Sequence, residues 1–248
     1  MPIKTIRADS LGDAFEKTIK FLSAWTRDGD PYCWFRGVKD KSLDLRPGAY
    51  WRKNYDEVGP LVMFAQEGVA FAEIEKMNCW KTYYLAQHSQ IPTRLLDWTD
   101  SLHTALFFAV MGSLTWKIEH PCVWIINPFR LNQRSTNANV IYDRDDKLHL
   151  DYYESAKSQR WPFDLPVAMA APWRNSRVYA QHGYFTLHGN DLRAIEECAP
   201  DCVKRVDIPQ HLVREIIHIL SHSSTNSFTL FPDLNGLALN LRRRFKLF

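Results

Sequence analysis

Polar side chains that could do chemistry lie at three separate places in the chain, each within an apolar or aromatic stretch. At the first place, Arg36 directly follows Trp34 and Phe35. A guanidinium at a strand end can bind a phosphate or carboxylate through parallel hydrogen bonds, and aromatic neighbours would exclude water. The alternative is a structural ion pair, for example with Asp97.

The second place, residues 87–99, is the densest polar and aromatic cluster of the chain. These side chains could bind a polar ligand, or they could satisfy the backbone of a buried turn and cap the helix that follows. We expect Thr99 or Asp100 to provide that cap. A single histidine such as His88 is more often a hydrogen-bonded structural residue than a catalytic base. The cluster contains Gln87, His88, Thr93, Arg94, Asp97, Trp98 and Thr99.

The third place is Gln181, which alternates with Tyr179 and Gly183 along a strand-like segment. A glutamine cannot serve as a general base. Its amide both donates and accepts hydrogen bonds, however, so it could hold a sugar hydroxyl or another amide. A purely structural role fits the residue type equally well.

Several familiar site motifs are missing from the sequence. It lacks the glycine-rich loops of Rossmann and P-loop nucleotide sites, the nucleophile elbow G-x-S-x-G and the zinc motif H-E-x-x-H. Cys198 and Cys202, with His188 upstream, resemble half of a zinc site, but no second pair has the spacing that four ligands need. We therefore expect no bound metal.

Length and composition indicate a folded globular chain. Its 248 residues suffice for a sizeable core, and 46% hydrophobic with 24% charged residues exclude disordered, collagen-like and coiled-coil classes. The net charge of +3 is too small to indicate nucleic acid or a membrane as a partner. The start is not leader-like, no run approaches ~18 apolar residues, and the five cysteines are scattered, so we expect a cytoplasmic location and no membrane partner.

The first half of the chain alternates between helical and strand-like patterns. A capping-box-like pair, Ser10 and Asp13, predicts an amphipathic helix over residues 10–27. Apolar spacing predicts one long helix or two consecutive helices between residues 60 and 90. Short strands are expected at residues 32–37 and 91–99, and a helix is expected at residues 102–109.

The second half contains a continuous apolar run at residues 122–126, which predicts a strand buried on both faces. Residues 130–174 are polar and contain prolines, which indicates a long excursion with at most one short helix. Strands are expected at 177–187 and 203–208, and helices at 212–220 and 234–241. The pattern predicts a single α+β domain, residues 1–248, with a central mixed or antiparallel sheet flanked by helices.

Several separated blocks of the sequence resemble the FRG domain family, a bacterial and phage-associated module named after its Phe-Arg-Gly motif. The blocks occur in the expected order over about residues 30–240. They are Trp34-Phe35-Arg36-Gly37, Gln87-His88 with residues 92–99, residues 105–109, Arg177-x-x-x-Gln181-x-Gly183-x-Phe185, and residues 229–234.

The block order is similar to that of ADP-ribosyltransferases, which implies a fold of that type and NAD as the substrate. The resemblance implies a toxin of a bacterial antiviral defence or toxin–antitoxin system that modifies nucleic acid, with RNA favoured, or protein. The main alternative is a non-enzymatic module that binds a nucleotide or nucleic acid. A weaker one is a hydrolase or nuclease that uses Asp97 with His88 or His182.

On this analogy, Arg36, Asp97 and Gln181 are the catalytic candidates. Arg36 would bind the diphosphate, Asp97 would stabilise the positive charge that develops on the ribose, and Gln181 would hold the ribose, although a transferase would have glutamate there. Arg36, Thr93, Asp97 and Gln181 are expected to line one cleft. The NAD-binding set is Arg36, Gly37, Gln87, His88, Thr93, Arg94, Thr99 and the stacking candidates Trp98 and Tyr184.

Residues 241–248 place four basic side chains among apolar ones. This segment is either a solvated helix end, where cations suit the helix dipole, or a docking segment for an acidic antitoxin or a phosphate backbone. Basic helix ends are common, which favours the first alternative.

Overall fold

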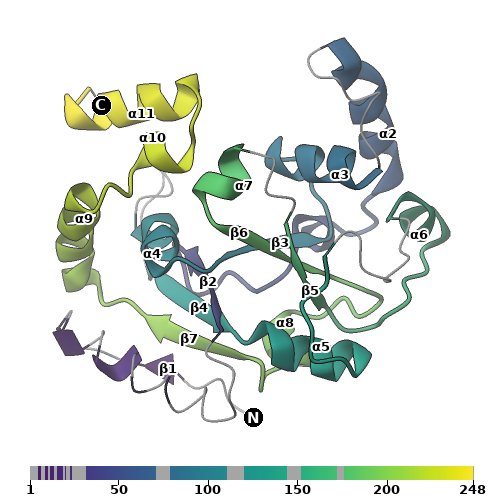
Figure 1. Cartoon of the computed structure of the whole chain (residues 1–248), viewed down its shortest axis with the longest axis horizontal. Coiled ribbons are helices and arrows are strands. Elements are labelled where there is room, and N and C mark those ends of the chain that lie inside the picture. The colour runs from purple at the N-terminus through teal and green to yellow at the C-terminus, as the bar shows by residue number, and fades with distance from the viewer. Residues whose placement is uncertain are drawn as a thin grey trace.

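A seven-stranded sheet in the order β1-β7-β4-β2-β3-β6-β5 forms the centre of the computed structural model (Figure 1). The structure describes residues 5–6, 9–10, 12–13, 16–18, 20, 23, 32–70, 79–110, 120–143, 152–171 and 176–247. All neighbouring strands are antiparallel except the short β1, which is parallel to β7. The expected α+β class with a central mixed sheet is confirmed. The strands are β1 Thr5–Ile6, β2 Trp34–Val38, β3 Leu95–Thr99, β4 Cys122–Ile126, β5 Val167–Ala170, β6 Gly183–Leu187 and β7 Val203–Asp207.

Helices cover both faces of the sheet and its β5 end (Figure 1). One face packs against α4 and α9, and the other packs against α5 and α8. An aromatic cluster joins α3 and α6 to β5 and β6. The α-helices are α2 Val58–Glu67, α3 Cys79–His88, α4 Leu102–Val110, α5 Pro128–Thr136, α6 Tyr152–Ser158, α7 Ser176–Ala180, α8 Ile195–Cys198, α9 Val213–His222, α10 Ser227–Leu230 and α11 Leu234–Arg244, and the 3-10 helices are Gly48–Trp51, Gly68–Ala70 and Gln210–Leu212.

The two central strands β2 and β3 share very little of their length. β2 pairs with β4 over all five of its residues, but it pairs with β3 only at Phe35 and Thr99. Beyond that pair the two strands are no longer paired. The backbone oxygen of Asp97 on β3 instead accepts a hydrogen bond from Nη1 of the Arg36 side chain at 2.7 Å. The separation of β2 from β3 makes room for a cavity in the middle of the sheet.

The firmest periodic patterns give the expected elements. The helix expected at residues 102–109 is α4, and the run at 122–126 is β4 with all five residues buried. In the part of residues 60–90 that the structure describes, α2 and α3 are helical as expected. The cap of α4 differs from the expectation, because the Ser101 hydroxyl accepts from the Thr104 N–H at 3.2 Å while Thr99 accepts from the Ser101 N–H. The helix expected at residues 10–27 lies mostly outside the described residues.

Two expectations for the second half are wrong. Residues 130–174 hold α5, α6 and β5 rather than at most one short helix. Residues 177–180 belong to α7 rather than to a strand, since the Gln181 N–H donates to the Arg177 carbonyl at 2.9 Å and His182 then turns the chain with a positive φ of 49°. The aromatic and β-branched residues of this segment favoured a strand, so the predicted strand began too early. The strand β6 begins only at Gly183.

Candidate functional site

The gap between β2 and β3 holds a cavity of about 290 Å³, which we name the Arg36 cavity. Its walls come from β2, β3, the end of α3, one side of α4, α7 with its turn into β6, and the segment after α10. Polar and aromatic side chains are mixed in it, as expected of a site that binds a polar ligand with a ring. The lining residues are Phe35, Arg36, Gly37, Gln87, His88, Gln90, Asp97, Trp98, Thr99, Thr104, Phe108, Arg177, Gln181 and Phe231.

Arg36 carries the least neutralised charge of this cavity. Its Nη1 donates to the Asp97 carbonyl at 2.7 Å and lies 3.7 Å from the Asp97 carboxylate, which is too long for a close ion pair. The side chain is 27% exposed, toward the cavity, and burial lowers the pKa of its guanidinium while Asp97 partly offsets that effect. Within the described chain the guanidinium makes no other hydrogen bond, so its remaining N–H groups can bind a ligand.

Asp97 is held in place by a chain of two hydrogen bonds. The Thr93 hydroxyl donates to the Gln87 Oε1 at 2.5 Å, which fixes the orientation of that amide. Gln87 Nε2 then donates to Asp97 Oδ2 at 3.1 Å. The Asp97 side chain is 52% exposed, and it is the only carboxylate among the described residues that line the cavity. The Thr93–Gln87 pair thus presents one oriented carboxylate beside Arg36.

The opposite wall contains Arg177, whose charge is already paired. Its Nε and Nη2 donate to Asp233 Oδ2 at 3.0 and 2.5 Å, and its Nη1 donates to the His88 carbonyl at 3.3 Å. The guanidinium also lies over the Phe231 ring, 5.6 Å from its centroid. Arg177 therefore fastens the start of α11 to the cavity wall, and Arg36 is left as the more available cation.

Gln181 lies in the turn between α7 and β6, not on a strand, but its side chain reaches the cavity as expected. Its Nε2 donates to the Leu230 carbonyl at 3.0 Å, and its backbone carbonyl accepts from the Thr99 hydroxyl at 2.7 Å. No described residue donates to the side-chain oxygen, which can therefore accept a hydrogen bond from a ligand hydroxyl.

His88 contributes a neutral ring to the cavity. Burial lowers its pKa, with Asp97 opposing and Arg177 adding to that effect, so the ring is uncharged at neutral pH. Its Nε2 is buried and has no hydrogen-bond partner in the described part of the chain. The ring can therefore donate or accept one hydrogen bond to a ligand, but its lowered pKa does not suit it to hold a proton at pH 7.

Three members of the expected binding set lie outside the cavity lining. Thr93 is buried behind Gln87, where it orients the amide. Arg94 is buried in an ion pair with Glu57, with 2.6 Å between Nη2 and Oε1. Tyr184 is buried against Trp34, with 4.6 Å between the ring centroids. The structure thus brings Arg36, Asp97 and Gln181 together as expected and places Thr93 one layer further in.

Arg177 and Phe231 line the cavity but were not among the expected site residues. Arg177 and Gln181 are four residues apart, a spacing that puts two side chains on one face of a helix, but the segment was expected to be a strand. Phe231 lies within residues 229–234, a block of the resemblance, but its apolar side chain gives no chemical sign of a site residue. Only the fold brings these residues to the cavity.

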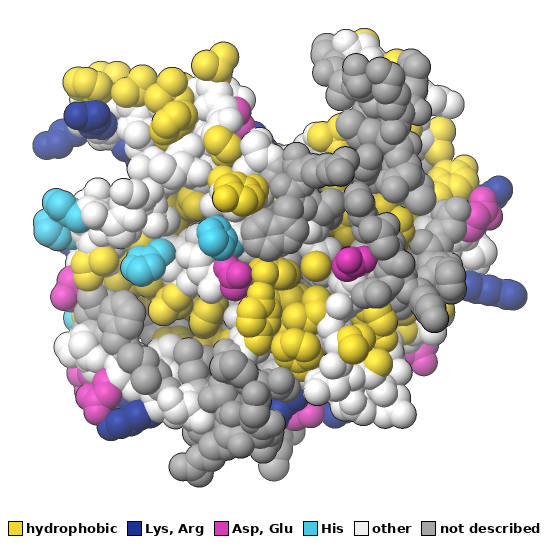
Figure 2. Space-filling view, viewed as in Figure 1, with side chains coloured by type: hydrophobic (Ala, Val, Ile, Leu, Met, Phe, Trp, Pro, Cys, Tyr) yellow, Lys and Arg dark blue, Asp and Glu magenta, His cyan; other side chains and the backbone are white. Residues whose placement is uncertain are grey.

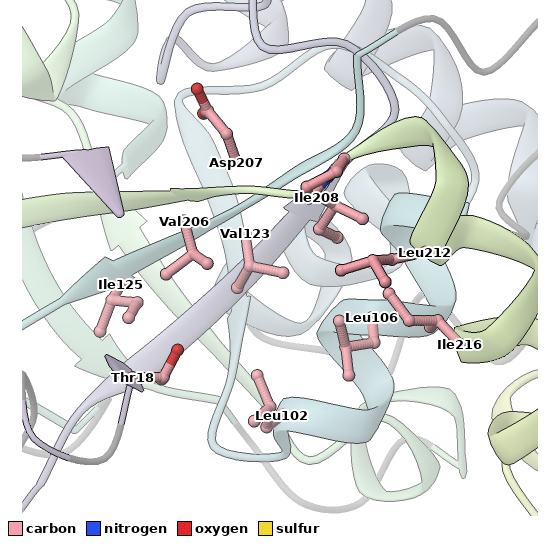
Figure 3. Close-up of a pocket in the computed structure, with 11 residues that line it drawn as sticks. Thr18, Leu102, Leu106, Val123, Ile125, Val206, Asp207, Ile208, Leu212 and Ile216 are labelled. Atoms are coloured by element: carbon pink, nitrogen blue, oxygen red, sulfur yellow. The ribbon is translucent and has the colours of Figure 1, made fainter. Parts of the chain in front are cut away.

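A second cavity lies under α4 and α9 and offers little chemistry. It measures about 50 Å³ and is lined by apolar side chains of both helices, β4 and β7 (Figure 3). Its only carboxylate, Asp207, points away from the apolar side chains in the close-up and is paired with Arg205 at 2.7 Å. Within the described residues no cluster of three or more histidine, cysteine, aspartate or glutamate side chains could hold a metal ion.

Part of the chain matches the model of a known protein family. Residues 32–116 match the model of the FRG domain. This segment of the chain is similar to the FRG domain. The match includes Arg36, Gln87 and Asp97, whereas Arg177, Gln181 and Phe231 of the cavity lie beyond it. No curated protein and no solved structure matches the chain. Among the helices that the structure describes, none is long and apolar enough to cross a bilayer.

Proposed function

We propose that the Arg36 cavity binds NAD and that the protein is an ADP-ribosyltransferase. The observation that carries this proposal is the meeting of three groups in one cavity: a guanidinium with unused donors on Arg36, the carboxylate of Asp97 and the side-chain oxygen of Gln181. They come from three distant parts of the sequence, and each has the chemistry that one part of NAD requires.

The reaction breaks the bond between ribose C1′ and the nicotinamide nitrogen. Nicotinamide leaves with the bonding electrons, positive charge develops on the ribose, and a nucleophilic acceptor attacks C1′ and loses its proton. Asp97 would stabilise the developing charge, because a carboxylate held in place by Gln87 need not reorient as that charge forms. Arg36 would bind the diphosphate through its free N–H groups, and Gln181 would accept a hydrogen bond from a ribose hydroxyl.

The aromatic residues give the cavity room for a ring. Phe35, Phe108 and Phe231 line it beside the polar groups, and a nucleotide base or nicotinamide can pack against such faces. Asp97 takes the role that glutamate has in transferases, since Gln181 cannot. We favour RNA as the acceptor, with protein as the other choice, and in a cell this chemistry would make the protein a toxin that an antitoxin must silence.

The test is to incubate the purified protein with NAD, measure nicotinamide release, and follow labelled ADP-ribose into RNA, DNA or lysate protein. Asp97→Asn should lower the rate by about 10² or more, because it removes the carboxylate while preserving shape. Asp201→Asn is the matched control, since Asp201 is an exposed aspartate paired with Arg134 at 2.9 Å. A wild-type rate in Asp97→Asn would remove Asp97 from the mechanism.

A non-enzymatic nucleotide-binding module is the second candidate, favoured by Gln181 at the position where a transferase would have a carboxylate. The same incubation separates the two. Saturable NAD binding without nicotinamide release supports the module, whereas release without transfer indicates an NAD hydrolase. Absence of both binding and release overturns the proposal.

A further inference from the structure

The helix α11 exposes an apolar stripe on its outer face. Leu234, Ala238, Leu241 and Phe245 follow one another at intervals of four, three and four residues, which places them on one side of a helix. All four are exposed, Leu234 at 83% and Phe245 at 65%. The space-filling view shows hydrophobic side chains along this helix at the upper left edge of the molecule (Figure 2). Such a stripe normally faces a core.

The orientation of α11 is fixed by its inner face. Gly236 is buried so close to the Phe231 carbonyl that a Cβ there would overlap it. Arg243 donates to the Ser227 hydroxyl at 3.0 Å, and its guanidinium lies over the Phe107 ring at 5.7 Å. The stripe therefore cannot turn inward without breaking these contacts.

The charged side chains beside the stripe indicate which kind of partner would bind it. Residues 234–248 contain no aspartate or glutamate. Arg242 and Arg244 are exposed and, at 100° per residue, lie on either side of the stripe, and Lys246 is exposed after it. An apolar seam flanked by cations is complementary to a helix with an apolar seam flanked by carboxylates.

We propose that the α11 stripe is a docking surface for an acidic amphipathic helix of a partner protein. A bilayer fits the stripe less well, because the stripe is narrow, has Asn235 and Asn240 on the polar sides of the helix, and is only three turns long. A second copy of this chain fits less well too, since it would bring no carboxylate from the same segment to the cations. Ala238 leaves a notch between Leu234 and Leu241 that a partner side chain can fill.

The test uses the full chain and two synthetic peptides of about 21 residues, long enough to form a helix. Both carry leucine at heptad positions a and d, and they differ in having glutamate or lysine at e and g. We expect the glutamate peptide to bind, with a Kd at least about tenfold lower than that of the lysine peptide.

Variants locate the surface. The double variant Leu234→Ser with Phe245→Ser and the double variant Arg244→Glu with Lys246→Glu should each weaken binding about tenfold or more. Leu192→Ser, at an exposed leucine elsewhere, is the control and should bind like the wild type. Unchanged thermal melts in all variants show that the fold is kept.

Four results would overturn the proposal. The first two are equal or absent binding of the two peptides, and peptide binding that the α11 variants leave unchanged. The third is sedimentation of the wild type as a dimer that the Leu234→Ser, Phe245→Ser variant abolishes. The fourth is stripe-dependent binding to vesicles of three parts phosphatidylcholine and one part phosphatidylglycerol, with no binding of either peptide. The proposal does not depend on which ligand the Arg36 cavity takes.

Discussion

Two arginines beside the centre of the sheet differ in how their charge is used. Arg94 is buried and makes hydrogen bonds to Glu57, Tyr50 and the Gly189 carbonyl. Among the described residues, Arg36 hydrogen-bonds only to the backbone oxygen of Asp97, and its Nη1 lies 3.7 Å from the Asp97 carboxylate. Arg94 is therefore a structural residue, while Arg36 has the donors left for a ligand.

This difference predicts opposite outcomes for two alanine variants. Arg94→Ala leaves Glu57 buried without its partner and should lower the free energy of unfolding by about 3–5 kcal/mol. Arg36→Ala should change it by about 1 kcal/mol or less, because its pair is long and exposed to the cavity. Urea denaturation measures both. A large loss in Arg36→Ala would make Arg36 a structural ion-pair residue instead.

The Thr93–Gln87–Asp97 chain predicts that a residue outside the cavity affects turnover. Thr93→Val removes the hydroxyl that fixes the Gln87 amide, so the kcat of NAD cleavage should fall about tenfold with little change in KM. Thr93→Ser keeps the hydroxyl and should restore the rate. Rates are compared well below the melting temperature, because Thr93 also accepts from the Leu95 N–H. Equal rates in the valine and serine variants would contradict the positioning role.

His188 predicts the pH dependence of stability. It is fully buried, and no described residue hydrogen-bonds to its Nδ1. Burial first, then Arg94 and Arg36, lower its pKa from 6.5 to about 3. The unfolded chain therefore takes up a proton below about pH 6.5 that the folded chain does not, and stability falls as pH falls. From about pH 7 to about pH 5 this group should cost about 2 kcal/mol.

The measurement is urea denaturation of wild type and His188→Gln at both pH values. The wild type should lose more stability than the variant over this interval, whatever their difference at pH 7. Identical losses would show that His188 is protonated in the folded protein.

At the scale of elements, Gly37 lets α4 pack on β2. A Cβ at position 37 would overlap the Ala105 carbonyl and approach the Ala109 N–H to 2.7 Å, both on the backbone of α4. This contact explains physically why the Phe-Arg-Gly motif ends in glycine, since the helix backbone presses directly on the strand that carries Arg36.

Gly37→Ala should therefore lower the free energy of unfolding by about 1–3 kcal/mol, the usual cost of overpacking a core. Gly183→Ala is the matched strand control, because its Cβ would meet only ordinary contacts of 3.4 Å or more. Denaturation midpoints of the two variants test this. Equal midpoints would mean that α4 can shift away from β2 without cost.

Sequence patterns predicted an element correctly where its burial could be inferred from its own residues. The apolar run of residues 122–126 correctly predicted β4, because a strand buried on both faces is apolar throughout. The helical spacing of residues 102–109 correctly predicted α4, because its apolar residues repeat with the helical period. α8 and α10 are four residues each, too short for a period to show. The prediction for residues 177–180 was wrong because the end of α7 depends on the turn at His182 rather than on the composition of the helix.

The candidate site was predictable only in part for a related reason. Charged or amide side chains inside apolar segments pointed to Arg36, Asp97 and Gln181 correctly as neighbours. Composition cannot tell whether a polar side chain of the 87–99 cluster faces the cavity or the core, so Thr93 and Arg94 were grouped with residues that line it. Tertiary packing alone decides that direction.

At the scale of the molecule, the Arg36 cavity joins the FRG-matched segment to the part of the chain after it. Arg36 and Asp97 come from the matched segment, whereas Arg177 and Gln181 come from the later part. The ion pair of Arg177 with Asp233, the N-cap of α11, connects the cavity wall to the helix that carries the exposed stripe. The site is thus a property of the whole fold rather than of the motif.

The most direct measurement is calorimetric titration of NAD into the wild type, Arg36→Lys, Arg36→Ala and the control Arg134→Ala, an exposed arginine paired with Asp201. We predict saturable binding to the wild type and the control. Both Arg36 variants should bind at least about tenfold more weakly while keeping a cooperative melt, since a lysine cannot reproduce the planar fork of a guanidinium. Wild-type affinity in Arg36→Ala, or no saturable binding of NAD to the wild type, would contradict the proposal that this cavity is an NAD site.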